Sequence, residues 1–143
     1  MNSISRQEGG EIVTFSGINY LAVVVAAVAA WLASSVWYMS LRKPYAAALN
    51  KAPVPAFGPY FFAFVVDLII AWMLAGLLGH LGAGQVTLHN GVLSGAFVWF
   101  GFVLTTMAVN YTFSGRDRRL LLIDAGNWLV VLLVIGAVIG LFG

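Results

Sequence analysis

Four long apolar stretches constrain this chain more than any other feature of its sequence. They run near residues 18–41, 57–78, 88–112 and 120–142, and each can cross a hydrocarbon core, which takes about 20 residues at a rise of about 1.5 Å per residue. Apolar residues make up 62% of the chain and charged residues only 8%, and the mean hydropathy is +0.96. These values lie far outside the range of soluble domains. The sequence therefore predicts an all-α integral membrane protein, a four-helix bundle of four transmembrane helices.

The spacing of the stretches indicates a single domain. We expect residues 17–143 to form one four-span transmembrane domain in contact with the lipid bilayer. A flexible, polar segment over residues 1–16 is expected to precede it. The first apolar run is too long for the core of a signal peptide, so we expect it to remain in the mature protein.

Basic residues between the stretches predict the orientation of the chain. Short loops rich in Lys and Arg stay on the inner side of a membrane. The first and third connections hold three basic residues each and the N-terminal segment holds one, while the second connection and the C-terminal tail hold none: Arg42, Lys43 and Lys51, then Arg116, Arg118 and Arg119, and Arg6. We therefore expect both termini outside. These short clusters do not form the long basic stripe that nucleic-acid binding needs, so no such partner is expected.

One carboxylate, Asp67, lies within the second stretch, in FFAFVVDLIIAW. Counting the helical rise from the inner end places it roughly 15 Å deep. Five other polar side chains lie roughly 10 Å deep by the same count: Ser34, Ser35, Thr105, Thr106 and Asn127. All six fall in the inner half, so we predict an intramembrane polar site that opens toward the inner face and has Asp67 at its floor.

The surroundings of Asp67 predict its state. No Lys, Arg or His shares its depth, so nothing offsets the cost of ionisation, and we expect a neutral carboxyl that carries a proton. We also expect this carboxyl to form a hydrogen bond with Asn127, Thr105, Ser34 or Ser35. A buried structural role and a functional role for Asp67 both stay open, because ionisable groups deep in a membrane are often functional.

A second carboxylate, Asp124, lies roughly 6 Å inside the inner end of the fourth stretch. It is within reach of Arg116, Arg118 and Arg119, so we predict an ion pair that anchors the helix end to its basic loop. Two carboxylates in contrasting environments are also a starting point for proton transfer, and that alternative stays open.

The sequence gives little support to other chemistry. Cysteine is absent, and the only histidines, His80 and His89, lie in the second connection without a nearby carboxylate. No serine has a neighbouring base that could activate it. We therefore predict no catalytic residues, no metal and no cofactor, and we do not expect an enzyme.

Small residues recur four apart in every stretch. Residues at this spacing share a helix face and let backbones approach closely in lipid. These faces fit packing within one chain or a homo-oligomer equally well. They comprise Ala22, Ala26, Ala30 and Ser34; Ala71, Ala75 and Gly79; Gly91 and Gly95; Gly136 and Gly140.

A family resemblance rests on INYLAVVVAAVAAWLASSVWY, FVWFGFVLTT and LLLIDAGNWLVVLLVIGAVIG. Through these segments the chain resembles the bacterial membrane proteins grouped as domain of unknown function 1761, over most of its length. In that pattern Asn19, Trp37 and Tyr38 recur, whereas Asn usually stands at Asp124 and Tyr-His at Asn127–Trp128. The resemblance implies four spans and a bacterial inner membrane, and it carries no activity.

Two functional classes follow from these features. A small transporter or channel, proton-linked through Asp67, would explain the inner polar site, although the sequence does not identify its small-molecule or ion substrate. A structural or accessory membrane subunit would need only the small-residue faces.

Overall fold

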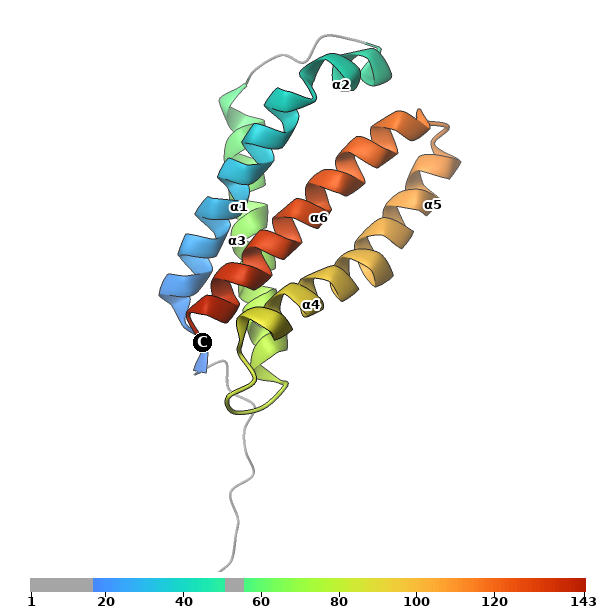
Figure 1. The fold of residues 1–143 in the computed structure, drawn as a ribbon. Helices are drawn as coiled ribbons and strands as arrows, with labels where there is room; N and C mark the ends of the chain where they lie inside the picture. The colour runs from blue at the N-terminus through green and yellow to red at the C-terminus, as the bar shows by residue number, and fades with distance from the viewer. Residues whose placement is uncertain (1–16, 51–55) are drawn as a thin grey trace, which may run out of the picture.

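The computed structural model describes residues 17–50 and 56–143, and all regular structure in these residues is helical (Figure 1). Four helical segments are long and apolar enough to span a membrane: Tyr20–Ser40, Phe57–Gly79, Leu88–Phe113 and Arg118–Leu141. The predicted all-α architecture with four spans is confirmed, with every helix end within two residues of its expected position. The flexible segment expected over residues 1–16 lies outside the described residues.

Three of the spans begin with a side chain that caps the helix. At α4 (Leu88–Val98), the Thr87 hydroxyl accepts a hydrogen bond of 3.2 Å from the N–H of Asn90. Before α1 (Tyr20–Ser40), the Asn19 side chain accepts a hydrogen bond of 3.1 Å from the N–H of Ala22. Before α6 (Arg118–Leu141), the Asp117 carboxylate accepts one of 2.8 Å from the N–H of Arg119. Each cap satisfies an N–H that has no partner within the helix.

A short helix, α2 (Arg42–Leu49), follows α1 directly, where sequence reasoning expected a loop. Pro44 stands in its first turn, the one place where a helix tolerates proline, and three alanines and a leucine complete it. Asn50 ends the helix in the left-handed conformation, at a φ of 56°. We term the end of the bundle that carries α2 and the connection between α5 and α6 the α2 end. It corresponds to the predicted inner face.

The second and third spans differ in regularity. α3 (Phe57–Gly79) is a continuous α-helix. The third span consists of α4 (Leu88–Val98), a π-helical segment η2 (Trp99–Leu104) and α5 (Thr105–Phe113), which follow one another without a break.

The π-helical segment sets which side of α5 faces α6. Gly95 of α4 packs against the backbone of α6, and in an unbroken α-helix Tyr111 would point about 160° away from that direction. A π-helical turn accommodates one extra residue and so turns the following helix back by about 100°. Tyr111 then lies within about 60° of the Gly95 direction. Both ends of the third span consequently face α6.

Helix α6 is the centre of the bundle and contacts α1, α3 and α4 (Figure 1). The closest approach is to α4, where a Cβ atom on Gly91 would overlap the carbonyl group of Gly136, and one on Gly136 would overlap that of Gly91. Only glycine at both positions lets the two backbones touch. These small-residue faces pack within one chain.

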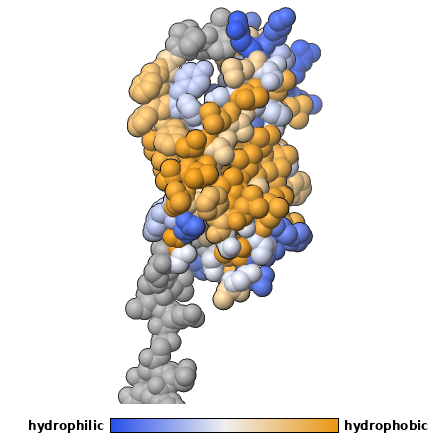
Figure 2. Space-filling view, turned by 60° about the vertical axis from the view of Figure 1, so that its left-hand side comes forward, coloured by the Kyte–Doolittle hydropathy of each residue, from blue (hydrophilic) through white to orange (hydrophobic). Residues whose placement is uncertain are grey.

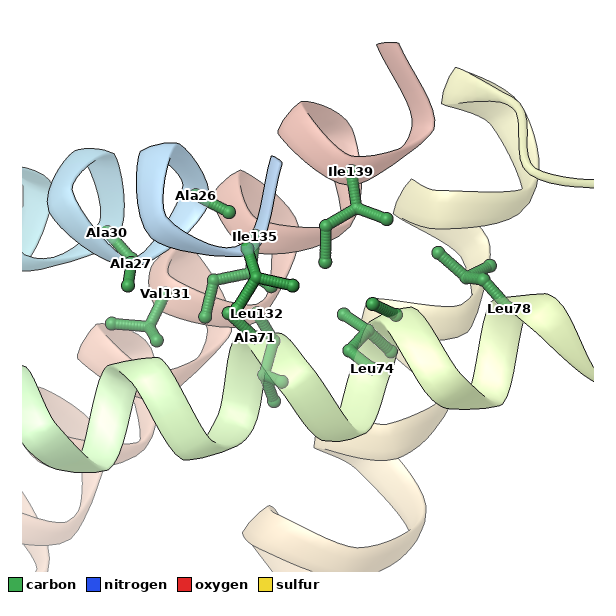
Figure 3. Close-up of a cluster of buried hydrophobic side chains, with 12 residues drawn as sticks. Ala26, Ala27, Ala30, Ala71, Leu74, Leu78, Val131, Leu132, Ile135 and Ile139 are labelled. Atoms are coloured by element: carbon green, nitrogen blue, oxygen red, sulfur yellow. The ribbon is translucent and has the colours of Figure 1, made fainter. Parts of the chain in front are cut away.

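The hydrophobic core lies where α1, α3 and α6 meet (Figure 3). Small residues from α1 face larger ones from α3 and α6, and together they fill the space between the helices. The labelled members are Ala26, Ala27, Ala30, Ala71, Leu74, Leu78, Val131, Leu132, Ile135 and Ile139.

The face of the molecule seen in Figure 2 has an apolar belt bounded by polar ends. Large side chains that would be buried in a soluble protein are exposed here, among them Phe62, Phe97 and Phe102. Contact with lipid tails accounts for them, because an apolar solvent favours an apolar surface. The belt and the four spans make this a multi-pass membrane protein.

The π-helical segment yields a deletion test. Removing Phe102, an exposed residue within it, should convert the span to a regular α-helix while Gly95 and Tyr111 keep their directions. We expect the melting temperature in detergent to fall by no more than about 4 °C, which corresponds to roughly 1 kcal/mol. Removing Leu93, an exposed residue between Gly91 and Gly95, is the matched control and should prevent stable folding, because it turns Gly95 by about 100° relative to Gly91 and out of its contact with α6. Equal damage from the two deletions would contradict this role of the π-helical turn.

Candidate functional site

Three side chains from three helices meet at the α2 end of the bundle. The Tyr38 hydroxyl of α1 donates a hydrogen bond of 2.6 Å to Oδ1 of Asp124 in α6. The Tyr111 hydroxyl of α5 donates a hydrogen bond to Oδ2 of the same carboxylate. This group, Tyr38, Tyr111 and Asp124, is termed the tyrosine clamp. An ionised carboxylate accepts both hydrogen bonds, one on each oxygen.

Two more side chains enclose the tyrosine clamp. The Arg116 guanidinium lies over the Tyr111 ring, 5.4 Å from its centroid, in a cation–π contact. The Tyr45 ring of α2 meets the Tyr38 ring edge-on, with centroids 5.1 Å apart. Burial raises the pKa of Tyr45 and the negative charge of Asp124 adds to that rise, while Arg116 opposes it. Tyr45 therefore stays a neutral phenol beside the clamp.

The predicted ion pair of Asp124 does not form. Within the described residues, none of Arg116, Arg118 and Arg119 makes a salt bridge, and all three side chains are exposed. Tyrosine hydroxyls hold Asp124 instead. The physical reason is that an exposed arginine in water gains little from a carboxylate, whereas two half-buried hydroxyls have few other partners.

Two tryptophans attach neighbouring helices to α6 just beyond the clamp. Nε1 of Trp37 donates to the carbonyl oxygen of Ile123 at 3.0 Å, and Nε1 of Trp99 donates to that of Ala125 at 2.7 Å. The Trp37 ring also covers Gly126, where a Cβ atom would come within 2.7 Å of the ring. These contacts hold α1 and the third span to α6 at the level of the clamp.

One turn deeper, the structure brings two predicted site residues together. The Ser34 hydroxyl donates a hydrogen bond of 2.7 Å to Oδ1 of Asn127, whose side chain is 4% exposed. The three other predicted members of this layer lie apart from the pair. The Ser35 hydroxyl donates to the carbonyl oxygen of Trp31 in its own helix, and Thr105 donates within the third span. Thr105 and Thr106 are exposed, so their predicted place in an interior pocket is wrong.

Asp67 lies on the face of α3 that packs into the bundle. It is 3% exposed and stands one turn before Ala71, which is fully buried in the core. Its carboxyl group makes no hydrogen bond to any of the described residues, Asn127, Thr105, Ser34 and Ser35 included. The sequence predicted its burial correctly, but the expected hydrogen bond is missing.

The helix contacts explain why the Ser34–Asn127 pair does not reach Asp67. The Trp31 ring of α1 meets the Phe64 ring of α3 edge-on, with centroids 6.2 Å apart. The two helices run in opposite directions (Figure 1). Ser34 lies three residues past Trp31 toward the α2 end, and Asp67 lies three residues past Phe64 away from it, so the two separations along the bundle add together. Asp67 therefore lies on the order of 9 Å deeper than Ser34, too far for a hydrogen bond.

Two hollows in the described part of the chain have linings without Asp67. One of about 390 Å³ lies between α2 and the start of α6, and one of about 490 Å³ lies along α1 beside Val130. Among the described residues, no three His, Asp or Glu side chains gather as a metal site would require. His80 contacts the carbonyl oxygen of Gly76, and His89 contacts Asn90.

The family comparison covers nearly the whole described chain. The model of a protein family of unknown function (DUF1761) matches residues 21–140. The chain belongs to the DUF1761 family. The resemblance inferred from the sequence is confirmed, and the match extends across parts of all four spans. No curated protein and no solved structure matches the chain.

Sequence reasoning missed the roles of three tyrosines in this DUF1761 protein. Tyr38 and Tyr111 stand at the inner ends of their spans, where aromatic residues are common without any site, and no pattern in the sequence singles out Tyr45. A signal was available, because Tyr38, Tyr111 and Asp124 all lie close to the inner ends of their spans. A carboxylate at that level needs donors, and tyrosine offers an O–H where lipid meets water.

Removing one hydroxyl from the tyrosine clamp of this DUF1761 protein should destabilise it. We expect Tyr38→Phe and Tyr111→Phe each to lower the free energy of unfolding by about 1.5 kcal/mol, the range of a hydrogen bond to a charged group. Denaturation in detergent measures the effect. Tyr45→Phe is the matched control and should change stability by less than about 0.5 kcal/mol, because its hydroxyl makes no hydrogen bond to the described residues. Equal losses for the three variants would contradict the clamp.

Proposed function

We propose that this protein is a small proton-linked membrane transporter in which Asp67 carries the proton. The observation that supports the proposal is an acidic residue on the inward face of α3 that is 3% exposed and makes no hydrogen bond to the described residues. A charge at the centre of a bilayer costs on the order of 3 kcal/mol. A carboxyl that holds a proton avoids that cost and can release the proton in another conformation.

Polar groups on one side of Asp67 support a route from the α2 end. Counted from the α2 end, the tyrosine clamp comes first, and the Ser34–Asn127 pair lies one helical turn deeper. Beyond the pair, Ala30 and Val131 are fully buried and interrupt the polar groups before the level of Asp67. On the opposite side of Asp67, the contact between Gly91 and Gly136 closes the bundle. Transport therefore requires a second conformation, and smooth glycine faces are where helices can slide.

A structural or accessory membrane subunit is the second candidate. The supporting observation is the third span, in which only 6% of the most apolar window is buried, against 44% in α6. Such a span offers a face to another membrane helix, either from a partner or from a second copy of the chain. In both cases we assign the protein to the bacterial inner membrane, following its family resemblance.

Proton flux into reconstituted vesicles tests the proposal. Under an imposed membrane potential, the natural protein should carry more protons than empty vesicles, and Asp67→Asn should fall to that background. Asn fits the same space as Asp but cannot release a proton at this position. Asp117→Asn is the matched control and should retain flux, because it removes an acid outside the spans and the proposed route, and Asn caps a helix about as well as Asp.

Two results would contradict this proposal. Flux of the natural protein that equals empty vesicles at every pH would favour the accessory subunit. Flux that persists in Asp67→Asn would show that protons move without this carboxyl. Size-exclusion chromatography of each variant checks that the bundle is folded.

A further inference from the structure

The hollow at the α2 end combines an arginine with an apolar floor. Its volume is about 390 Å³, and its lining comprises Ala48 and Leu49 of α2, then Arg116, Asp117 and Leu120. Leu120 is buried, whereas Arg116 is exposed. The two sides of the hollow thus come from segments that are more than 60 residues apart in the sequence.

The basic side chains around this hollow outnumber the acidic ones. Five basic side chains lie at this end, and none makes a salt bridge within the described residues: Arg42, Lys43, Arg116, Arg118 and Arg119. The Asp117 carboxylate in the lining already accepts the hydrogen bond that caps α6. The Asp124 carboxylate is held by two tyrosines. The positive charge at this end therefore exceeds the negative charge, and it is available to an anion.

Location distinguishes between possible anions. The hollow lies between the end of α2 and the start of α6. On the face seen in Figure 2, a polar end of the molecule bounds the apolar belt. Lipid phosphates lie at this level of a membrane, with acyl chains that extend along the belt. Arg116 is also held in place, since its guanidinium lies over the Tyr111 ring, and arginine offers two parallel donors to a phosphate.

We propose that this hollow binds the phosphate of an anionic phospholipid, with Arg116 as its main donor. Ala48, Leu49 and Leu120 supply an apolar wall for the glycerol and the first carbons of the acyl chains. The site is independent of Asp67 and of any transport activity. Because Arg116 contacts Tyr111, a bound lipid would also stabilise the tyrosine clamp.

Thermal stability in a neutral detergent, titrated with phosphatidylglycerol, tests this site. The melting temperature of the natural protein should rise with phosphatidylglycerol and stay unchanged with phosphatidylcholine or inorganic phosphate. The titration is made in about 1 M NaCl, where the screening length falls to about 3 Å and general charge attraction is suppressed. Arg116→Gln should weaken the apparent affinity by about tenfold.

Matched variants separate the site from general charge and from folding. Arg118→Gln removes the same charge outside the lining and should change the affinity by less than about twofold. Ala48→Trp fills the hollow and should abolish binding with every arginine in place. Ala47→Trp adds the same side chain on the exposed side of α2 and should leave lipid binding unchanged.

Equal effects of Arg116→Gln and Arg118→Gln would overturn the proposal. An unchanged affinity in Ala48→Trp would also overturn it, because the hollow itself would then play no part. A shift of the same size with inorganic phosphate alone would assign the site to a free anion and overturn the lipid assignment. Near-ultraviolet circular dichroism of each variant before lipid is added confirms that tertiary packing is retained.

Discussion

The backbone contact between α4 and α6 is the constraint on which the rest of the bundle depends. Lipid tails are as apolar as leucine, so helices in a membrane associate through close packing and hydrogen bonds and gain little from burying apolar surface. Gly91 and Gly136 allow the closest approach in this chain, and they make α6 the helix around which the others pack. That contact also fixes the direction of the third span. At the other end of the third span, the π-helical turn directs Tyr111 toward Asp124 of α6.

The spans were predictable because length and hydropathy alone determine them. Glycine spacing also indicated the packing faces, but it could not say which faces meet, since any two small faces can pack closely. The helix α2 was missed because prolines at both ends of its segment suggested a loop, although Pro44 sits where a first helical turn accepts it. Nothing in WFGFVL distinguishes a π-helical turn from an apolar α-helix. Its existence follows only from the need for Gly95 and Tyr111 to face α6 together.

The polar site was harder to predict because the place of a side chain on a helix depends both on its depth in the membrane and on its direction around the helix axis. Counting residues placed Asp67, Thr105 and Asn127 in the inner half, but the direction of each side chain around its helix depends on tertiary packing. Thr105 faces outward, whereas Asn127 meets Ser34 inside the bundle. For Asp124, reasoning from charge favoured the arginines. Water screens exposed arginines, and half-buried hydroxyls at the same level made the stronger partners.

The central claim is that Asp67 holds a proton inside the bundle at neutral pH. Infrared spectroscopy of the protein in lipid measures this directly, because a protonated carboxyl has a C=O stretching band that a carboxylate lacks, and the chain has only five acidic side chains. The account predicts such a band at neutral pH in the natural protein and in Asp124→Asn, and its loss in Asp67→Asn. A natural protein without the band, or a band that persists in Asp67→Asn, would contradict it.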